Sequence, residues 1–158
     1  MTTAIIQARM SSTRLPGKVL LPLCDKTVLE HIVNRVRAAC NVDSILVATS
    51  NSLADDIIEE KCKIMGVSVF RGNENNVIER FYFAAKQAKT DVVVRITADD
   101  PLKDPEIIDD IVRLQKNGGF DYVSNTIHPT FPEGLDCEAF TYEALEEAYI
   151  QAKLSSEK

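Results

Sequence analysis

The chain has 158 residues, a length typical of one domain that can bury roughly 70% of its unfolded surface. Hydrophobic residues make up 45% and charged residues 27%, which excludes disorder, collagen and coiled coil as the overall class. With 18 Lys and Arg against 24 Asp and Glu, the net charge is −6. This balance argues against a surface that coats nucleic acid or anionic lipid, although a local cationic patch could still hold a small anionic ligand.

The four cysteines indicate reduced structural thiols, because no CxxC pair occurs and the two histidines lie too far apart for a zinc site. No apolar run approaches the roughly 18 residues of a membrane span. The first residues lack the charged and apolar regions of a signal peptide and are typical of a strand. We therefore expect a cytoplasmic protein without a membrane partner.

The first half of the chain predicts three strands separated by single helices. Thr27 and Glu30 form a capping box at the start of the first helix. Ser52 is a suitable N-cap for the second helix, which should end at Gly66 because glycine is favoured just past a helix end. The expected strands cover residues 4–7, 44–48 and 67–70.

The second half continues the alternation. The helical period of apolar residues recurs over residues 77–88. Asp104 followed by Pro105 predicts the start of a helix that runs to about residue 116, and Thr141 is a suitable cap for the last helix. The expected strands cover residues 91–96 and 122–125.

Single helices between strands indicate parallel βαβ units, and the apolar run Val92-Val93-Val94 suits a sheet that is covered on both faces. We predict an α/β fold: one three-layer α/β/α domain, residues 1–158, with a mostly parallel sheet. Ligands of such folds bind at the carboxyl ends of the strands, so the loops that follow the strands should hold the site.

The loop after the first strand concentrates positive charge. It holds Arg9, Arg14 and Lys18, and residues 1–24 contain no acid, so they carry +3 while the other 134 residues carry −9. Arginine forks and a lysine point charge suit a polyphosphate, which we favour over a merely solvated basic loop. The Walker A spacing and the GxGxxG fingerprint do not occur, which argues against P-loop kinases and nicotinamide dehydrogenases.

Asp99 follows the fourth expected strand, at the edge of the sheet that the cationic loop also occupies. Mg²⁺ binds one or two protein carboxylates together with phosphate oxygens and water. Asp99 is therefore a candidate ligand for Mg²⁺. The alternative is a solvated turn before Pro101.

Residues 7–20, QARMSSTRLPGKVL, closely resemble the opening signature of the sugar-acid cytidylyltransferases, which include CMP-ketodeoxyoctonate synthetase and the acylneuraminate cytidylyltransferases. The resemblance continues in order along the chain and is closest to the spore coat polysaccharide biosynthesis proteins of the F type. It implies a Rossmann-like fold of the nucleotide-diphospho-sugar transferase type. The further matching segments are residues 76–82, 95–102 and 132–138.

The resemblance implies a reaction in which CMP passes from CTP to a sugar or sugar acid and pyrophosphate leaves, in surface or spore coat polysaccharide biosynthesis. Asp99 matches the metal-binding Asp of the family's Gly-Asp-x-Pro pattern, with Ala98 in place of Gly and Asp100 at the variable position. Mg²⁺ is the implied cofactor, and neither nucleic acid nor membrane is an implied partner.

The resemblance also assigns roles to individual residues. Arg14 and Lys18 would hold the β- and γ-phosphates as catalytic residues, assisted by Arg9. Asp136 and Glu138 would face the sugar, although each could equally be a loop acid. The implied nucleotide-binding residues are Ala8, Arg9, Ser11, Ser12, Arg14, Lys18 and Arg80, of which Arg80 would lie near the base or, equally, on a solvent face.

Two other functions stay open at this point. A glycosyltransferase that uses a sugar nucleotide could share the architecture, although Asp99-Asp100-Pro101 does not match its usual DxD motif. A non-catalytic nucleotide-binding module is the other, because family members are generally longer than this chain, so we expect its C-terminus to be truncated relative to theirs. In several related synthetases a second metal carboxylate and the homodimer contacts come from later sequence.

Overall fold

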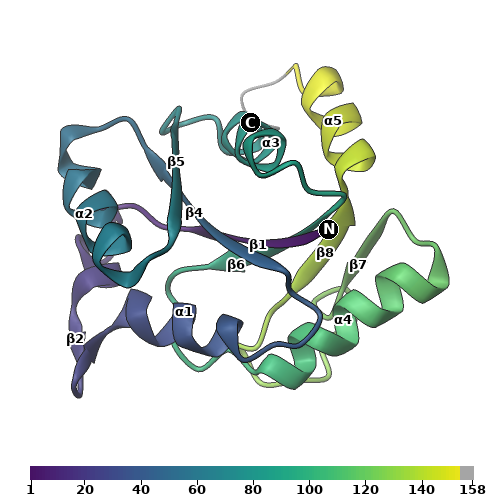
Figure 1. Cartoon of the computed structure of the whole chain (residues 1–158), viewed down its shortest axis with the longest axis horizontal. Coiled ribbons are helices and arrows are strands. Elements are labelled where there is room, and N and C mark those ends of the chain that lie inside the picture. The colour runs from purple at the N-terminus through teal and green to yellow at the C-terminus, as the bar shows by residue number, and fades with distance from the viewer. Residues whose placement is uncertain (154–158) are drawn as a thin grey trace.

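The computed structural model describes residues 1–153 and shows a central sheet between two layers of helices (Figure 1). The end of the predicted domain, residues 154–158, lies outside the described residues. The strands of the main sheet are β1 (Thr2–Gln7), β4 (Ser44–Ser50), β5 (Ser68–Gly72), β6 (Val92–Thr97), β7 (Tyr122–Ser124) and β8 (Glu138–Thr141). The helices are α1 (Val28–Arg37), α2 (Asp56–Met65), α3 (Val77–Ala88), α4 (Pro105–Gly118) and α5 (Tyr142–Gln151).

The sheet has the order β5-β4-β1-β6-β8-β7, and β5, β4, β1 and β6 run parallel to one another. The prediction of an α/β fold with a mostly parallel sheet is therefore confirmed. β8 was not predicted, and it runs antiparallel to both of its neighbours. A separate small hairpin joins β2 (Pro22–Leu23) to β3 (Lys26–Thr27) just before α1.

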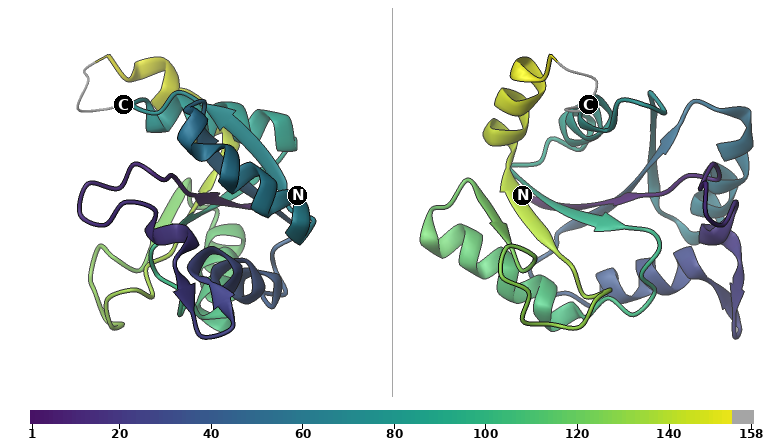
Figure 2. Two further views of the ribbon diagram at one scale, coloured as in Figure 1. Left: turned by 90° about the vertical axis from the view of Figure 1, so that its left-hand side faces the viewer. Right: turned by 180° about the vertical axis from the view of Figure 1, so that it is seen from behind.

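Alternate residues of the strands point to opposite faces of the sheet and build two cores. Ile6 and Val94 contribute to the core beneath α1, α2 and α4, whereas Ile5 and Val93 contribute to the core beneath α3 and α5. The right view of Figure 2 shows these two helical layers on either side of the sheet. Among residues 1–153, no helix combines the length and apolar character needed to cross a membrane.

Side-chain caps begin the helices where the sequence predicts them. The Thr27 hydroxyl accepts from the Glu30 amide at 3.3 Å, and the Glu30 carboxylate accepts from the Thr27 amide at 2.7 Å, which completes the capping box. Gly66 ends α2 with a φ of 65°, in the left-handed region that glycine adopts readily. The cap predicted for α2 differs, because Ser52 caps a short 3-10 helix, Leu53–Asp55, that precedes α2.

Candidate functional site

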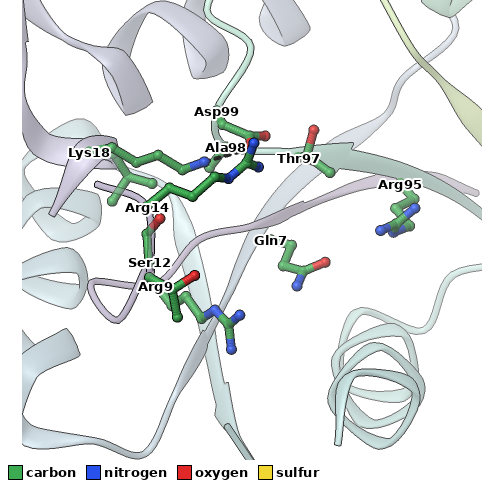
Figure 3. Close-up of a pocket in the computed structure, with 11 residues that line it drawn as sticks. Gln7, Arg9, Ser12, Arg14, Lys18, Arg95, Thr97, Ala98 and Asp99 are labelled. Carbon is green, nitrogen blue, oxygen red and sulfur yellow. Dashed lines mark hydrogen bonds and ion pairs between the residues drawn. The ribbon is translucent and has the colours of Figure 1, made fainter. Parts of the chain in front are cut away.

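The loop after β1 borders a cavity of about 240 Å³ at the carboxyl ends of β1 and β6 (Figure 3). The left view of Figure 2 shows this purple loop projecting from the sheet on the same side as the green-yellow segment that precedes β8. We call this space the phosphate cavity, after the ligand that the sequence predicts for its cations. Its lining residues are Gln7, Arg9, Ser12, Thr13, Arg14, Lys18, Val19, Arg95, Thr97, Ala98 and Asp99.

Residues 10–17 form an arch that is closed at its base by backbone hydrogen bonding. The Gly17 amide donates to the Met10 carbonyl at 2.9 Å, and the Met10 amide donates to Asp55 at 2.7 Å. Gly17 has a φ of 72°, and a Cβ there would lie 3.1 Å from the Met10 methyl group, so a glycine suits this position. The exposed crest of the arch therefore stands on a fixed base.

Arg14, in the arch, and Lys18, directly after it, both extend toward Asp99 (Figure 3). The Lys18 ammonium lies 2.6 Å from the Asp99 carboxylate. Partial burial works to raise the pKa of Asp99, but hydrogen bonds from Lys18 and Thr97 outweigh it, so the pKa is lowered and the carboxylate is ionised at neutral pH. The structure thus brings two predicted cations and the predicted metal ligand to one place.

A second cavity, of about 610 Å³, adjoins the phosphate cavity and shares Arg14, Lys18, Thr97 and Asp99 with it. We call it the acceptor cavity, after the sugar acceptor that the family resemblance implies. Its other lining residues are Leu15, Asp100, Glu133, Gly134 and Asp136. Three of these belong to the segment between β7 and β8, which therefore forms the far wall.

Asn125 closes the base of this far-wall segment. Its side-chain amide donates to the Leu135 carbonyl at 3.0 Å and accepts from the Cys137 amide at 2.9 Å. The segment thus leaves the sheet after β7 and returns to it at β8 through a closed neck.

Lys103 lies behind the acceptor cavity and joins the turn after β6 to the far wall. Its side chain is 1% exposed, and its ammonium lies 3.1 Å from the Asp100 carboxylate and 2.8 Å from the Asp136 carbonyl. Asp100 also accepts from the Thr97 hydroxyl at 3.0 Å. Lys103 was not among the predicted site residues, because nothing in its neighbours along the chain indicates that it is buried.

Arg80 lies outside the lining of both cavities. It is 1% exposed, and one guanidinium nitrogen donates to the backbone carbonyls of Asn73 and Glu74, at 2.5 and 3.1 Å. Its Nε and Nη2 atoms have no hydrogen-bond partner among the described residues. Burial, and then repulsion from Arg9, lower the pKa of this guanidinium.

Three further predicted residues also lie apart from the lining of the cavities. Ala8 is buried and donates its amide to the Ala48 carbonyl at 3.1 Å. The Ser11 hydroxyl donates to Glu74, and Glu138 forms an ion pair with Arg95 between β8 and β6. The roles predicted for these residues therefore stay predictions.

A metal ion at this site would take few ligands from the described part of the chain. Within residues 1–153, no group of three or more His, Cys, Asp or Glu side chains is arranged to hold a metal. Asp99 offers a hard carboxylate oxygen beside cations that suit phosphate. This donor set fits Mg²⁺, which is commonly bound by one or two carboxylates with phosphate oxygens and water as the remaining ligands.

The chain is similar to known proteins over nearly all of its length. A cytidylyltransferase family model matches residues 3–155. An uncharacterised protein of Methanocaldococcus jannaschii is 46% identical over 94% of this chain, and the spore coat polysaccharide biosynthesis protein SpsF of Bacillus subtilis is 43% identical over 75% of it. The matches span 60% and 51% of those two proteins' own lengths.

Among solved structures, a cytidylyltransferase from Leptospira borgpetersenii superposes with a TM-score of 0.93 at 40% identity. The match covers 99% of this chain and 66% of that one. These matches agree with the order of the sheet and with the cationic loop after its first strand. The chain belongs to the cytidylyltransferase family.

Proposed function

We propose that this chain transfers CMP from CTP to a hydroxyl group of a sugar or sugar acid and releases pyrophosphate. The observation that carries the proposal is the convergence of Arg14 and Lys18 on Asp99 at the boundary between two cavities. One cavity has the cations that a triphosphate needs, and the other offers polar groups to a hydroxylated acceptor. Membership of the cytidylyltransferase family supports a site that holds both a nucleotide and an acceptor.

The chemistry needs alignment and charge neutralisation more than covalent help from the protein. Arg14 and Lys18 hold the β- and γ-phosphates, assisted by Arg9, and stabilise the charge that develops on the leaving pyrophosphate. The acceptor hydroxyl attacks the α-phosphorus from the acceptor cavity. A new P–O bond forms, the bond between the α-phosphorus and the bridging oxygen breaks, and the hydroxyl proton passes to solvent.

Asp99 would hold Mg²⁺, since its carboxylate lines both cavities. When bound, the ion would neutralise phosphate charge and polarise the α-phosphate. Lys18 is paired with Asp99 in this structure. On binding, the Lys18 ammonium would exchange the Asp99 carboxylate for a phosphate oxygen.

Outside this central group, we propose that the backbone of Ala8 and the hydroxyls of Ser11 and Ser12 complete the nucleotide site. Arg80 would support the base indirectly, because it holds the backbone of residues 73–74. In the far wall, Asp136 would contact the sugar.

Glu138 would orient Arg95, with which it forms an ion pair. We also propose a cytoplasmic role in surface or spore coat polysaccharide synthesis, and the name of SpsF supports the link to spore coat polysaccharide. We also propose that the chain forms a homodimer.

Replacing either cation of the arch tests the clamp. Arg14→Ala and Lys18→Ala should each lower kcat/KM by at least about tenfold, because each removes a charge-assisted contact that strengthens in the transition state. The measurement is pyrophosphate release from each nucleoside triphosphate with a panel of sugars and sugar acids. Lys116→Ala, which removes an exposed cation at the far end of α4, is the control and should retain the wild-type rate.

Four results would contradict parts of this scheme. Wild-type kcat/KM in both arch variants would remove the clamp, and Asp99→Asn with an unchanged Mg²⁺ titration would remove Asp99 from the metal site. Sugar transfer from a UDP-sugar without pyrophosphate release would instead indicate a glycosyltransferase. Binding of CTP and Mg²⁺ without turnover would indicate a nucleotide-binding module.

A further inference from the structure

We propose that Asp55 is a positioning residue that holds the base of the arch at the end of β4 and thereby sets the separation of the cations that bind the triphosphate. Its effect on CTP rests on the proposed function, whereas its effect on the arch does not. Asp55 lines neither cavity, so it would act through Met10 rather than on the substrate.

The Asp55 carboxylate accepts hydrogen bonds from two separate segments. Oδ1 accepts from the Met10 amide at 2.7 Å. Oδ2 accepts from the Thr49 hydroxyl at 3.0 Å, from the Ser50 amide at 3.0 Å and from the Ser50 hydroxyl. The residue is 1% exposed, so a full set of donors compensates for the burial of its charge.

Met10 is the residue through which this anchor reaches the cations. Its amide is bound by Asp55, and its carbonyl accepts from Gly17 at the other end of the arch. Arg9 precedes Met10 and Lys18 follows Gly17, so the single anchored residue fixes the backbone next to both cations. A misplaced phosphate clamp loses the orientation on which transfer depends.

The buried charge of Asp55 has a second effect at the same place. Burial and the neighbouring Arg9 lower the pKa of Arg80, whereas Asp55 acts in the opposite direction. The carboxylate therefore offsets repulsion between Arg9, which lines the phosphate cavity, and Arg80, which lies outside its lining. Neutralising Asp55 would remove this compensation as well as the anchor.

The test is Asp55→Asn in the whole chain. The amide group keeps the size of the side chain, but it removes the negative charge and turns one acceptor into a donor that faces N–H or O–H groups. In the nucleotide-free protein, hydrogen exchange at the Met10 and Gly17 amides should accelerate by at least about tenfold. The Kd for CTP should rise by at least about tenfold, whereas the KM for the acceptor should change by less than about threefold.

Asp109→Asn is the matched control. Asp109 is also buried, at 8% exposure, and accepts from the Cys40 and Asn41 amides at 2.9 and 2.7 Å. Its partners precede the amino end of β4, away from the arch. This variant should lower the Tm about as much as Asp55→Asn while exchange at Met10 and the Kd for CTP keep their wild-type values.

Unchanged exchange at Met10 in Asp55→Asn would overturn the anchor, and an unchanged Kd for CTP would overturn its positioning role. An equal loss of CTP affinity in Asp109→Asn would reduce the effect to general destabilisation. If Asp55→Asn does not fold, Ser50→Ala removes one donor and keeps the carboxylate, and it should accelerate the same two amides by about two- to fivefold; wild-type exchange there would also overturn the proposal. If the wild type binds no CTP, the proposed function fails, and the exchange data alone decide whether Asp55 anchors the arch.

Discussion

Lys103 shows how one side chain can set the shape of a cavity that it does not line. Its ammonium is buried behind the acceptor cavity and contacts the Asp100 carboxylate and the Asp136 carbonyl. These two partners belong to different walls. The cost of burying the lysine is compensated only while both walls keep their places, so its charge couples the β6 turn to the far wall.

Lys103→Met should lower the free energy of unfolding by about 2–4 kcal/mol, because it leaves Asp100 without its buried cation. Urea denaturation measures this, and the KM for the acceptor should rise while the Kd for CTP stays close to wild type. Lys26→Met breaks an exposed pair with Asp25 and should leave the unfolding midpoint unchanged. Wild-type stability in Lys103→Met would mean that the pair contributes nothing to folding.

At the scale of elements, local chemistry made the helices predictable and left one strand of the main sheet unpredicted. Thr27 and Glu30 cap α1 through contacts three residues apart, so the sequence alone contains the necessary information. β8 is four residues long and exists because Phe140 pairs opposite Val93, 47 positions earlier in the chain. Such a pairing depends on the assembled sheet, and a run of four residues is too short to predict it.

The capping box also predicts how stability changes with pH. Hydrogen bonds from Thr27 and then Lys61 lower the pKa of Glu30 from 4.5 to about 2. The folded state therefore gains stability from the ionised carboxylate above about pH 4.5 and loses it as the pH falls toward 2.

Glu30→Gln should flatten the fall of Tm between pH 4.5 and pH 2, the window set by those two pKa values. Glu60→Gln, on the exposed side of α2, is the control and should keep the wild-type slope. Thermal unfolding followed by circular dichroism across this range makes the comparison. Identical slopes for wild type and Glu30→Gln would contradict the role of the cap.

At the scale of the whole molecule, topology explains which parts of the site the sequence could predict. The loop cations and Asp99 meet because β1 and β6 are parallel neighbours whose carboxyl ends share an edge. Asp55 and Lys103 were missed, because the partner that ties each of them to a distant segment lies 45 and 33 positions away, respectively. In the sequence, a charged residue that will be buried cannot be distinguished from one that will be exposed, because the fold brings its partners together.

The charge distribution predicts a salt effect on nucleotide binding. Residues 1–24 carry +3 on a body of −9, so the attraction that we expect for CTP is local and partly exposed to solvent. Raising NaCl from about 50 to about 300 mM should weaken CTP binding by at least about threefold, because the ions screen the arch. Titration calorimetry should show that the Kd for CTP depends less on salt in Arg14→Ala than in the wild type. A wild-type Kd that does not change with salt would argue against an exposed clamp.

The closed neck at Asn125 has a consequence for how such enzymes diverge. Its two hydrogen bonds isolate the interior of the far wall from the strands on either side. Insertions or replacements within residues 126–134 can therefore remodel the acceptor cavity without shifting the register of β7 and β8. We therefore expect this segment to tolerate replacement during evolution, so that the acceptor cavity changes while the proposed nucleotide site keeps its structure.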